Sequence, residues 1–188
     1  MKRTWISMMA MALAGGVAMS QPAAASEPYV GVGLGSFVLD DGLNRQDTLG
    51  GYLQLGDDFS PYLGGELRVG ASSKTSEEAV PVVRPASRVD WFAAFYLKPK
   101  YAFSENWMGY GLVGVGSLRA SYYPIGAAKQ TKTRIGLGYG LGLQYRLADQ
   151  YSLGAEWSHL LQRPSNATAT QFQGVGVSMY TLSAKYHF

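Results

Sequence analysis

Five side chains near residue 160 carry the groups that a nucleophilic hydrolase needs. Glu156, Ser158, His159, Ser165 and Asn166 supply a carboxylate, two hydroxyls, an imidazole and an amide. A histidine activates a hydroxyl only within hydrogen-bond distance of it. Neighbouring residues of a strand point to opposite faces, which separates Ser158 from His159, and Ser165 falls in the linker that follows. We therefore expect no catalytic residue, treat His159 as an interfacial side chain, and keep a hydrolase as an alternative.

A second set of polar side chains recurs at alternate positions of otherwise apolar segments. It consists of Glu66, Arg68, Asp90, Lys98, Arg134, Gln144, Arg146, Glu156 and Lys185. If these segments are strands, the whole set lies on the faces opposite the apolar ones. Buried charges must be paired and hydrogen-bonded, because an unpaired buried charge costs about 3–5 kcal/mol. The pattern predicts an internal network of salt bridges that plugs the fold, with a gated ion path as the alternative.

Other chemistry finds little support in the sequence. The Gly31-Val32-Gly33 and Gly138-Tyr139-Gly140 runs are not followed by the helix that a phosphate-binding turn requires. Past residue 25 the chain has His159 and His187 and no cysteine, and its acidic residues are scattered without ligand spacing. We therefore expect no cofactor and no metal.

The first 25 residues have the pattern of a cleaved signal peptide. Lys2 and Arg3 precede an apolar stretch, and Ala23, Ala24 and Ala25 supply small residues before Ser26. We expect cleavage after Ala25 and a single domain over residues 26–188. Without the two leader cations the net charge falls from +3 to +1. A nucleic-acid-binding function is therefore not expected, because such domains are strongly basic.

The rest of the chain alternates with a period of two, which is typical of β-strands. The clearest case is 133–146, where Ile135, Leu137, Leu141 and Leu143 alternate with four glycines and with Gln144. The other expected strands are 30–35, 49–56, 63–70, 89–98, 108–118, 151–158 and 180–188. The faces of 108–118 stay unassigned, because Tyr110 and Leu112 are out of phase with Val113 and Val115. None of the other seven apolar faces contains a charge, so these faces suit lipid.

The linkers between these strands fall into two alternating classes. Those near 40–47, 72–87, 120–132 and 161–173 are long and polar, whereas those near 57–60, 102–106 and 147–150 are short. Long loops on one rim and short turns on the other are typical of bacterial outer-membrane barrels. A soluble lipocalin-like barrel or a β-sandwich would instead present glycine-rich faces to water, which weakens strands. We predict an all-β fold, an eight-stranded antiparallel up-and-down transmembrane β-barrel, with Trp91, Trp157, Tyr186 and Phe188 near the membrane interfaces.

Two stretches resemble a known family. The last strand, Tyr180, Leu182, Ala184, Tyr186 and Phe188 in alternation, resembles the C-terminal signature that the barrel-assembly machinery reads in bacterial outer-membrane proteins. The whole chain is similar to the small barrels of the outer-membrane protein A transmembrane domain and outer-membrane protein X type. The run 61–66 resembles the third strand of outer-membrane protein A, whose matching glutamate belongs to a lumenal ion pair proposed to gate a narrow pore. The family's arginine partner falls at Gly154 here, so the resemblance does not carry that pair over intact.

These observations predict a structural or surface-interaction protein of the outer membrane of a Gram-negative bacterium, displaying four extracellular loops on a barrel filled with side chains. The partners implied are outer-membrane lipid and lipopolysaccharide, the assembly machinery during biogenesis, and a host or surface ligand at the loops. We expect a monomer. A lipid A-modifying enzyme and a narrow gated pore are the alternatives.

Overall fold

The computed structural model describes residues 26–40, 45–74, 86–123, 128–160 and 176–188. These residues form eight strands: β1 (Glu27–Asp40), β2 (Arg45–Asp58), β3 (Leu63–Ser72), β4 (Ala86–Ala102), β5 (Trp107–Tyr123), β6 (Gln130–Ala148), β7 (Tyr151–Leu160) and β8 (Gly176–His187). Among the described residues, no helix is long and apolar enough to cross a membrane.

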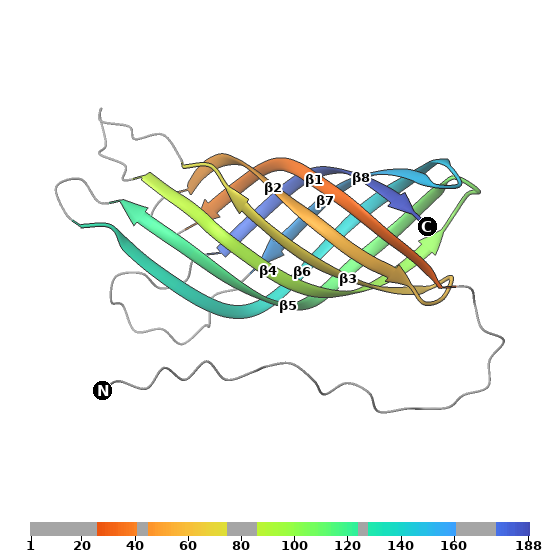
Figure 1. The fold of residues 1–188 in the computed structure, drawn as a ribbon, viewed down its shortest axis with the longest axis horizontal. Coiled ribbons are helices and arrows are strands. Elements are labelled where there is room, and N and C mark those ends of the chain that lie inside the picture. Colours follow the sequence, from red (N-terminus) through yellow and green to blue (C-terminus); the bar gives the residue numbers. More distant parts are fainter. Residues whose placement is uncertain (1–25, 41–44, 75–85, 124–127, 161–175) are drawn as a thin grey trace, which may run out of the picture.

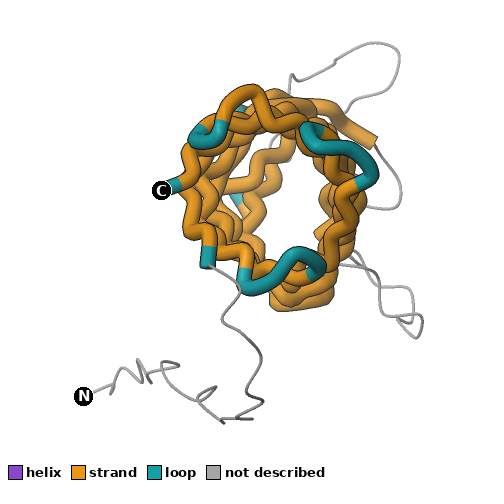
Figure 2. Tube along the Cα trace, turned by 90° about the vertical axis from the view of Figure 1, so that its right-hand side faces the viewer, coloured by secondary structure: helices purple, strands orange, loops and turns teal. Residues whose placement is uncertain are grey.

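The strands close into one antiparallel barrel in chain order, which confirms the predicted fold class (Figure 1). Each strand pairs with its chain neighbours, and β1 pairs with β8 from Tyr29↔His187 to Asp40↔Gly176. Viewed down its axis, the barrel is a complete ring (Figure 2). Closure leaves no free sheet edge where all eight strands pair, which is the condition for a β-structure to span lipid.

The connections at the end of the barrel that carries the C-terminus are short. They are the turns at 59–62, 103–106 and 149–150, which lie at the right-hand end in Figure 1. The start of β1 and the C-terminus also meet there, because the amide of Phe188 donates to the carbonyl of Pro28 at 3.0 Å. By the outer-membrane pattern of short periplasmic turns, this end is periplasmic.

At the other end the expected loops at 40–47 and 120–132 are wrong in part. β1 reaches Asp40 and pairs it with Arg45 of β2, while β5 and β6 pair out to Tyr122↔Gln130. The antiparallel ladder continues although apolar residues no longer mark one face, so the sequence shows no strand signal there. We call residues 86–90, 119–123 and 130–133 of β4, β5 and β6 the outer extension. The expected linkers at 72–87 and 161–173 fall mostly outside the described residues.

The two faces of the wall follow the predicted alternation, with one exception. Leu34, Leu53, Leu137, Leu141 and Leu182 are 64–71% exposed on the outside, as suits a wall that faces lipid. In β5, Tyr110, Leu112 and Leu118 point inward and Val113 and Val115 point outward. Val89 was expected outside but is fully buried, because a bulge between Val89 and Trp91 shifts the register.

Candidate functional site

The centre of the lumen is an arginine held between two glutamates. Arg68 Nε donates to Glu66 Oε1 at 2.5 Å, while Nη1 and Nη2 donate to the two carboxylate oxygens of Glu156 at 2.5 and 2.6 Å. Glu66 and Arg68 share the inward face of β3 because they are two residues apart, and Glu156 comes from β7 on the far side. All three side chains are inaccessible to solvent. This bidentate, charge-assisted geometry is the strong form of an ion pair.

Two tyrosine rings cover the guanidinium of Arg68. Its central carbon lies 4.6 Å from the ring centroid of Tyr52 and 5.2 Å from that of Tyr96. These are cation–π distances. The adjacent inward positions are glycines, which leave the rings room: a Cβ on Gly33 would collide with the ring of Tyr52, and one on Gly138 would lie 2.8 Å from Tyr96. Glycines on the inward faces therefore leave the space that large aromatic rings occupy in a narrow barrel.

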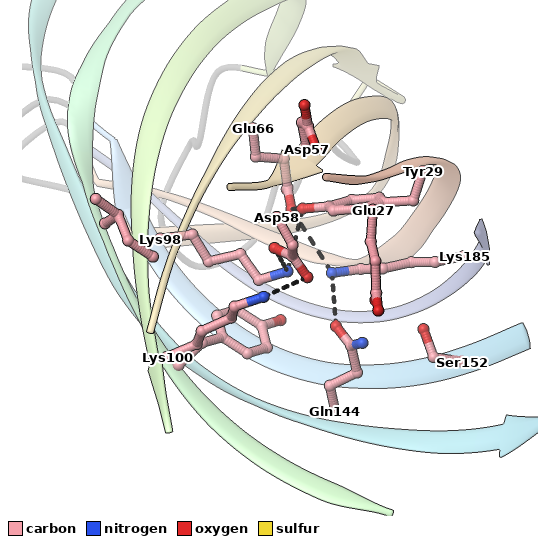
Figure 3. A network of polar contacts seen from close by, with 12 residues as sticks. Glu27, Tyr29, Asp57, Asp58, Glu66, Lys98, Lys100, Gln144, Ser152 and Lys185 are labelled. Atoms are coloured by element: carbon pink, nitrogen blue, oxygen red, sulfur yellow. Dashed lines mark hydrogen bonds and ion pairs between the residues drawn. The ribbon is translucent and has the colours of Figure 1, made fainter. Parts of the chain in front are cut away.

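A second cluster adjoins Glu66, and Figure 3 shows its side chains. Its members Tyr29, Asp58 and Lys98 lie toward the short-turn ends of β1, β2 and β4. The Tyr29 hydroxyl donates to Glu66 Oε2 at 2.5 Å and accepts from Lys98 Nζ at 3.1 Å. Lys185 Nζ lies 3.6 Å from Glu66 Oε2. The ammonium groups of Lys98 and Lys185 both lie over the ring of Tyr29, at 4.6 and 4.9 Å from its centroid. The carboxylate of Glu66 thus meets one guanidinium, one ammonium and one hydroxyl.

The outer contacts of this cluster complete its charge pairing. Asp58 bridges two lysines, with Lys100 Nζ at 2.7 Å and Lys98 Nζ at 3.6 Å. Lys185 Nζ also donates to Gln144 Oε1 at 3.2 Å, and the Tyr110 hydroxyl donates to Glu156 Oε2 at 3.0 Å. We call these side chains the lumenal network: Tyr29, Asp58, Glu66, Arg68, Lys98, Lys100, Tyr110, Gln144, Glu156 and Lys185.

The predicted polar set falls into three groups in the structure. Six members meet in the lumenal network: Glu66, Arg68, Lys98, Gln144, Glu156 and Lys185. Arg146 lies at the periplasmic mouth, where its Nη2 contacts Glu27 Oε2 at 2.8 Å with both side chains partly exposed. Arg134 lies on the inward face of β6 near the outer end, opposite Leu118.

Asp90 does not join the lumenal network. It occupies the β4 bulge, accepts a hydrogen bond from Ser121, and pairs with Arg88 and Arg119 at 3.5 and 3.9 Å. Strict alternation had placed it on the inward face near the outer rim. The bulge adds one residue to the strand, and that changes the side on which Asp90 lies.

Four members of the network were not predicted: Tyr29, Asp58, Lys100 and Tyr110. Three of them continue an alternation just beyond the expected strand ends, because Lys100 is in phase with Lys98, Asp58 with Gln54 and Tyr29 with Gly31. Extending each strand by two residues would have found them. Tyr110 lay in the segment whose faces the sequence left open.

The outer half of the lumen is apolar. Phe37, Val89, Phe92 and Leu160 are 0% exposed there, with Leu118, Val177 and Met179 packed in the same cluster. The ring centroids of Phe37 and Phe92 are 5.9 Å apart, and that of Tyr52 lies 6.3 Å from Phe92. We call this group the outer plug. Since water does not reach these side chains, they close the lumen above the lumenal network.

The hydrolase candidates are separated, as expected for neighbours on a strand. Ser158 points inward and is fully buried, while His159 points outward and its Nδ1 lies 2.9 Å from the hydroxyl of Ser178 on β8. Among the described residues, no carboxylate hydrogen-bonds to His159, and no group of three His, Asp or Glu side chains could hold a metal ion. Ser165 and Asn166 lie outside the described residues.

The outer extension and the residues next to it carry most of the exposed cations described at that end. Arg88 and Arg119 are 45% and 50% exposed in their side chains. Lys74 and Lys129 place their ammonium groups 4.7 and 5.4 Å from the ring centroid of Tyr123. Asp90 is the carboxylate that contacts the two arginines. The result is a basic, aromatic surface beyond the membrane wall.

Comparison with known proteins identifies the architecture. Residues 9–188 match the family model described as outer membrane protein beta-barrel domain. No curated protein sequence matches the chain significantly. Among solved structures, Neisserial surface protein A superposes with a TM-score of 0.69 at 14% identity, covering 87% of this chain and 99% of that one.

Two further solved structures have the same fold at lower TM-scores. The attachment invasion locus protein Ail of Yersinia pestis, in complex with the heparin analogue sucrose octasulfate, gives a TM-score of 0.57 at 19% identity over 87% of this chain and 99% of that one. The outer membrane protein OprG of Pseudomonas aeruginosa gives 0.53 at 12% identity, over 88% and 99%.

Proposed function

The chain belongs to the outer membrane protein beta-barrel domain family, and from that premise we propose that it is a surface-interaction protein that binds anionic polymers at its outer extension. Its place is the outer membrane of a Gram-negative bacterium. The observation that carries the proposal is the exposed pair Arg88 and Arg119 on β4 and β5, two strands that continue beyond the lipid-facing wall, with Lys129 directly before β6. Function belongs to such sites and not to the fold, which many activities share.

The chemistry of the outer extension suits sulfate or phosphate groups carried on a polymer. Arginine guanidinium groups bind such anions with paired donors. Arg88 and Arg119 share one carboxylate, that of Asp90, so the three side chains retain a positive charge. The Ail structure with a sulfated heparin analogue supports this ligand class for a barrel of the same fold.

The filled lumen supports a display function over a pore. The outer plug and the lumenal network occupy successive layers along the barrel axis, which leaves an ion little room to pass.

In a deacylase, His159 would need a carboxylate to orient its ring. Among the described residues, the hydrogen-bond partner of His159 is the Ser178 hydroxyl and not a carboxylate. Lipid A deacylation is therefore a weaker hypothesis for the function of this chain than surface display.

The proposal is tested by binding of heparin to the purified protein in lipid nanodiscs, with uncharged dextran as the polymer control. Arg88→Ala combined with Arg119→Ala should weaken binding about tenfold or more, because each lost charge-assisted contact contributes about 1 kcal/mol. Binding should also fall as salt screens the charges. Asp90→Asn should strengthen binding, since it releases both arginines from their carboxylate.

Arg146→Ala removes the same charge at the periplasmic mouth and serves as the matched control, for which we expect no change. Absence of heparin binding by the wild-type protein, or equal loss in the Arg146 variant, would contradict the proposal. Heparin-independent release of an acyl chain from lipid A, lost in His159→Ala, would favour the enzyme instead.

A further inference from the structure

The lipid-facing wall carries a concentrated group of hydrogen-bonding side chains on β6, β7 and β8. Tyr139, Trp157, His159, Ser178 and Tyr180 all point outward on these neighbouring strands. The ring centroid of Tyr139 lies 5.8 Å from that of Trp157 and 5.4 Å from that of His159, and His159 Nδ1 lies 2.9 Å from Ser178 Oγ. We call these five side chains the wall patch.

The outer end of the wall patch lies just inside the apolar band. A strand that rises about 3.3 Å per residue at a tilt of about 40° advances about 2.5 Å per residue along the membrane normal. The rings of Tyr151 and Tyr186, whose centroids are 5.4 Å apart, belong to the periplasmic aromatic row. His159 and Ser178 are each eight residues from that row along β7 and β8. They therefore lie about 20 Å into an apolar band about 25 Å tall, about 5 Å below its outer boundary.

Trp157 and Tyr180 lie deeper, because each is six residues from the same aromatic row, or about 15 Å into the band. Trp157, which we expected at an interface, is therefore inside the apolar band. On the wall formed by β2, β3 and β4, outward residues such as Leu49, Val69 and Phe95 are 48–67% exposed and carry no hydrogen-bonding group. The hydrogen-bonding side chains are thus concentrated on one side of the barrel.

The wall patch has more hydrogen-bonding groups than it uses. Among the described residues, its internal hydrogen bond joins His159 to Ser178, whereas the hydroxyls of Tyr139 and Tyr180 and the indole N–H of Trp157 have no partner. A polar group left unpaired in an apolar medium costs free energy, and hydrocarbon chains supply no donor or acceptor. The wall patch is therefore suited to a molecule that carries hydrogen-bonding groups to within about 10 Å of the outer boundary.

A groove continues from the wall patch toward the periplasmic end. It has a volume of about 810 Å³, with Trp157 and Tyr180 at its outer end and Gly109 near its other end. Gly109 is two residues along β5 from Trp107, which packs against Tyr145 in the periplasmic aromatic row. The groove therefore extends from about 15 Å above this row to within about 5 Å of it.

Small outward residues leave this groove open. A Cβ added to Gly111 would meet Pro99 at 3.5 Å, and one on Gly109 would meet Phe103 at 3.7 Å, both ordinary contacts. Unlike the lumenal glycines, these two are not required by packing inside the barrel. Their missing side chains leave room on the lipid-facing surface for an extended hydrocarbon chain.

We propose that the wall patch and this groove bind one lipid A molecule of the outer leaflet. The wall patch holds the acyl linkages and the groove holds an acyl chain. The order of the two features along the membrane normal carries this assignment, because the hydrogen-bonding groups lie nearer the outer boundary and the apolar groove lies deeper. A lipid of the outer leaflet has the same order, with its polar linkages above its hydrocarbon. A lipid of the inner leaflet would place its linkages at the periplasmic aromatic row instead.

Lipid A fits the wall patch better than a glycerophospholipid does. Its acyl chains carry hydroxyl groups and amide linkages, which both donate and accept, whereas the ester linkages of a phospholipid only accept. The wall patch offers both functions, because the indole N–H of Trp157 donates only, and tyrosine hydroxyls and imidazole donate and accept. Lipid A also forms the outer leaflet of Gram-negative outer membranes, in which this chain lies. This site is separate from the outer extension, which lies on β4, β5 and β6 beyond the membrane wall.

Native mass spectrometry of the purified protein in detergent micelles tests the site by titration with purified lipid A or with cardiolipin. Cardiolipin also has two phosphates and several acyl chains, but those chains carry no hydroxyl or amide. Tyr139→Phe combined with Tyr180→Phe keeps both rings and removes both hydroxyls. This variant should weaken lipid A binding about tenfold and leave cardiolipin binding unchanged. Tyr151→Phe combined with Tyr186→Phe, in the periplasmic aromatic row, is the matched control and should change neither.

Filling the groove provides a second measurement on the same titration. Ala155→Phe should also weaken lipid A binding about tenfold, whereas Ala184→Phe, in the separate groove on the β8–β1–β2–β3 wall, should not. Heat-modifiable gel mobility shows whether each variant is folded. Equal binding of lipid A and cardiolipin by the wild-type protein would overturn the proposal. So would a loss of lipid A binding in Arg88→Ala with Arg119→Ala but not in the tyrosine variant, because the lipid phosphates alone would then be recognised.

Discussion

The guanidinium of Arg68 and the carboxylate of Glu156 form a bidentate ion pair across the lumen, at 2.5 and 2.6 Å, from strands on opposite sides of the barrel. No described ion pair in the lumen ties together strands further apart around the ring. Arg68 also contacts Glu66 on its own strand, so one guanidinium holds two carboxylates and joins β3 to β7 through that of Glu156.

Breaking this pair should destabilise the barrel strongly. Glu156→Gln leaves Arg68 with one carboxylate in a site that water does not reach, and the loss of one partner of a buried pair costs about 3–5 kcal/mol. Urea unfolding in lipid vesicles measures the change. Glu27→Gln breaks the partly exposed pair with Arg146 and should cost less than about 1 kcal/mol; equal losses would contradict the assignment.

Glu66→Ala should also destabilise the protein, because it strands Arg68 and Lys185 without their shared carboxylate. A pore gated by this residue would instead respond with increased conductance. Unfolding and planar-bilayer recordings on the same variant separate the two outcomes. A rise in conductance at unchanged stability would support the pore.

The wild-type protein should show no stable large conductance in planar bilayers. Phe37 and Phe92 close the outer half of the lumen, and Arg68 with its glutamates closes the middle. Phe37→Ala together with Phe92→Ala should open only the outer half, so this variant should stay closed as well. Large, regular single-channel steps from the wild type would defeat this prediction.

Arginine on the lipid face should be costly near the midplane. Leu137→Arg, Leu141→Arg and Phe95→Arg should each cost about 2–4 kcal/mol, because the charge enters hydrocarbon. The control, Glu105→Arg in the periplasmic turn, should change the unfolding free energy by less than about 1 kcal/mol. Equal tolerance at Leu141 and Glu105 would contradict the assigned faces.

Inward and outward glycines should respond differently to a methyl group. Gly142 faces the lumen, where a new Cβ would collide with the ring of Tyr110, whereas Gly111 on the next strand faces outward, where a new Cβ would meet Pro99 at an ordinary 3.5 Å. Gly142→Ala should therefore cost about 1–3 kcal/mol through overpacking, and Gly111→Ala should leave the unfolding free energy of the barrel nearly unchanged. The two variants are compared in the same urea titration.

The sequence by itself determined the wall of the barrel. Alternation with a period of two is a property of each strand alone, so it assigned Leu141 to lipid and Glu66 to the lumen without any knowledge of neighbours. It also placed six members of the lumenal network on inward faces. Alternation failed at the β4 bulge and beyond the membrane, where apolar residues no longer mark one face: Val89 and Asp90 changed sides, and β5 and β6 continued through an expected loop.

Only the tertiary structure decided which of these residues meet. Arg68 and Glu156 are 88 positions apart, and their contact depends on the stagger of all the strand pairs between them and on closure of β1 against β8. Stagger is set by hydrogen bonds between strands, and nothing in the spacing within one strand encodes it. For the same reason the sequence did not reveal Ser178 as the partner of His159 or the packing of apolar rings in the outer plug.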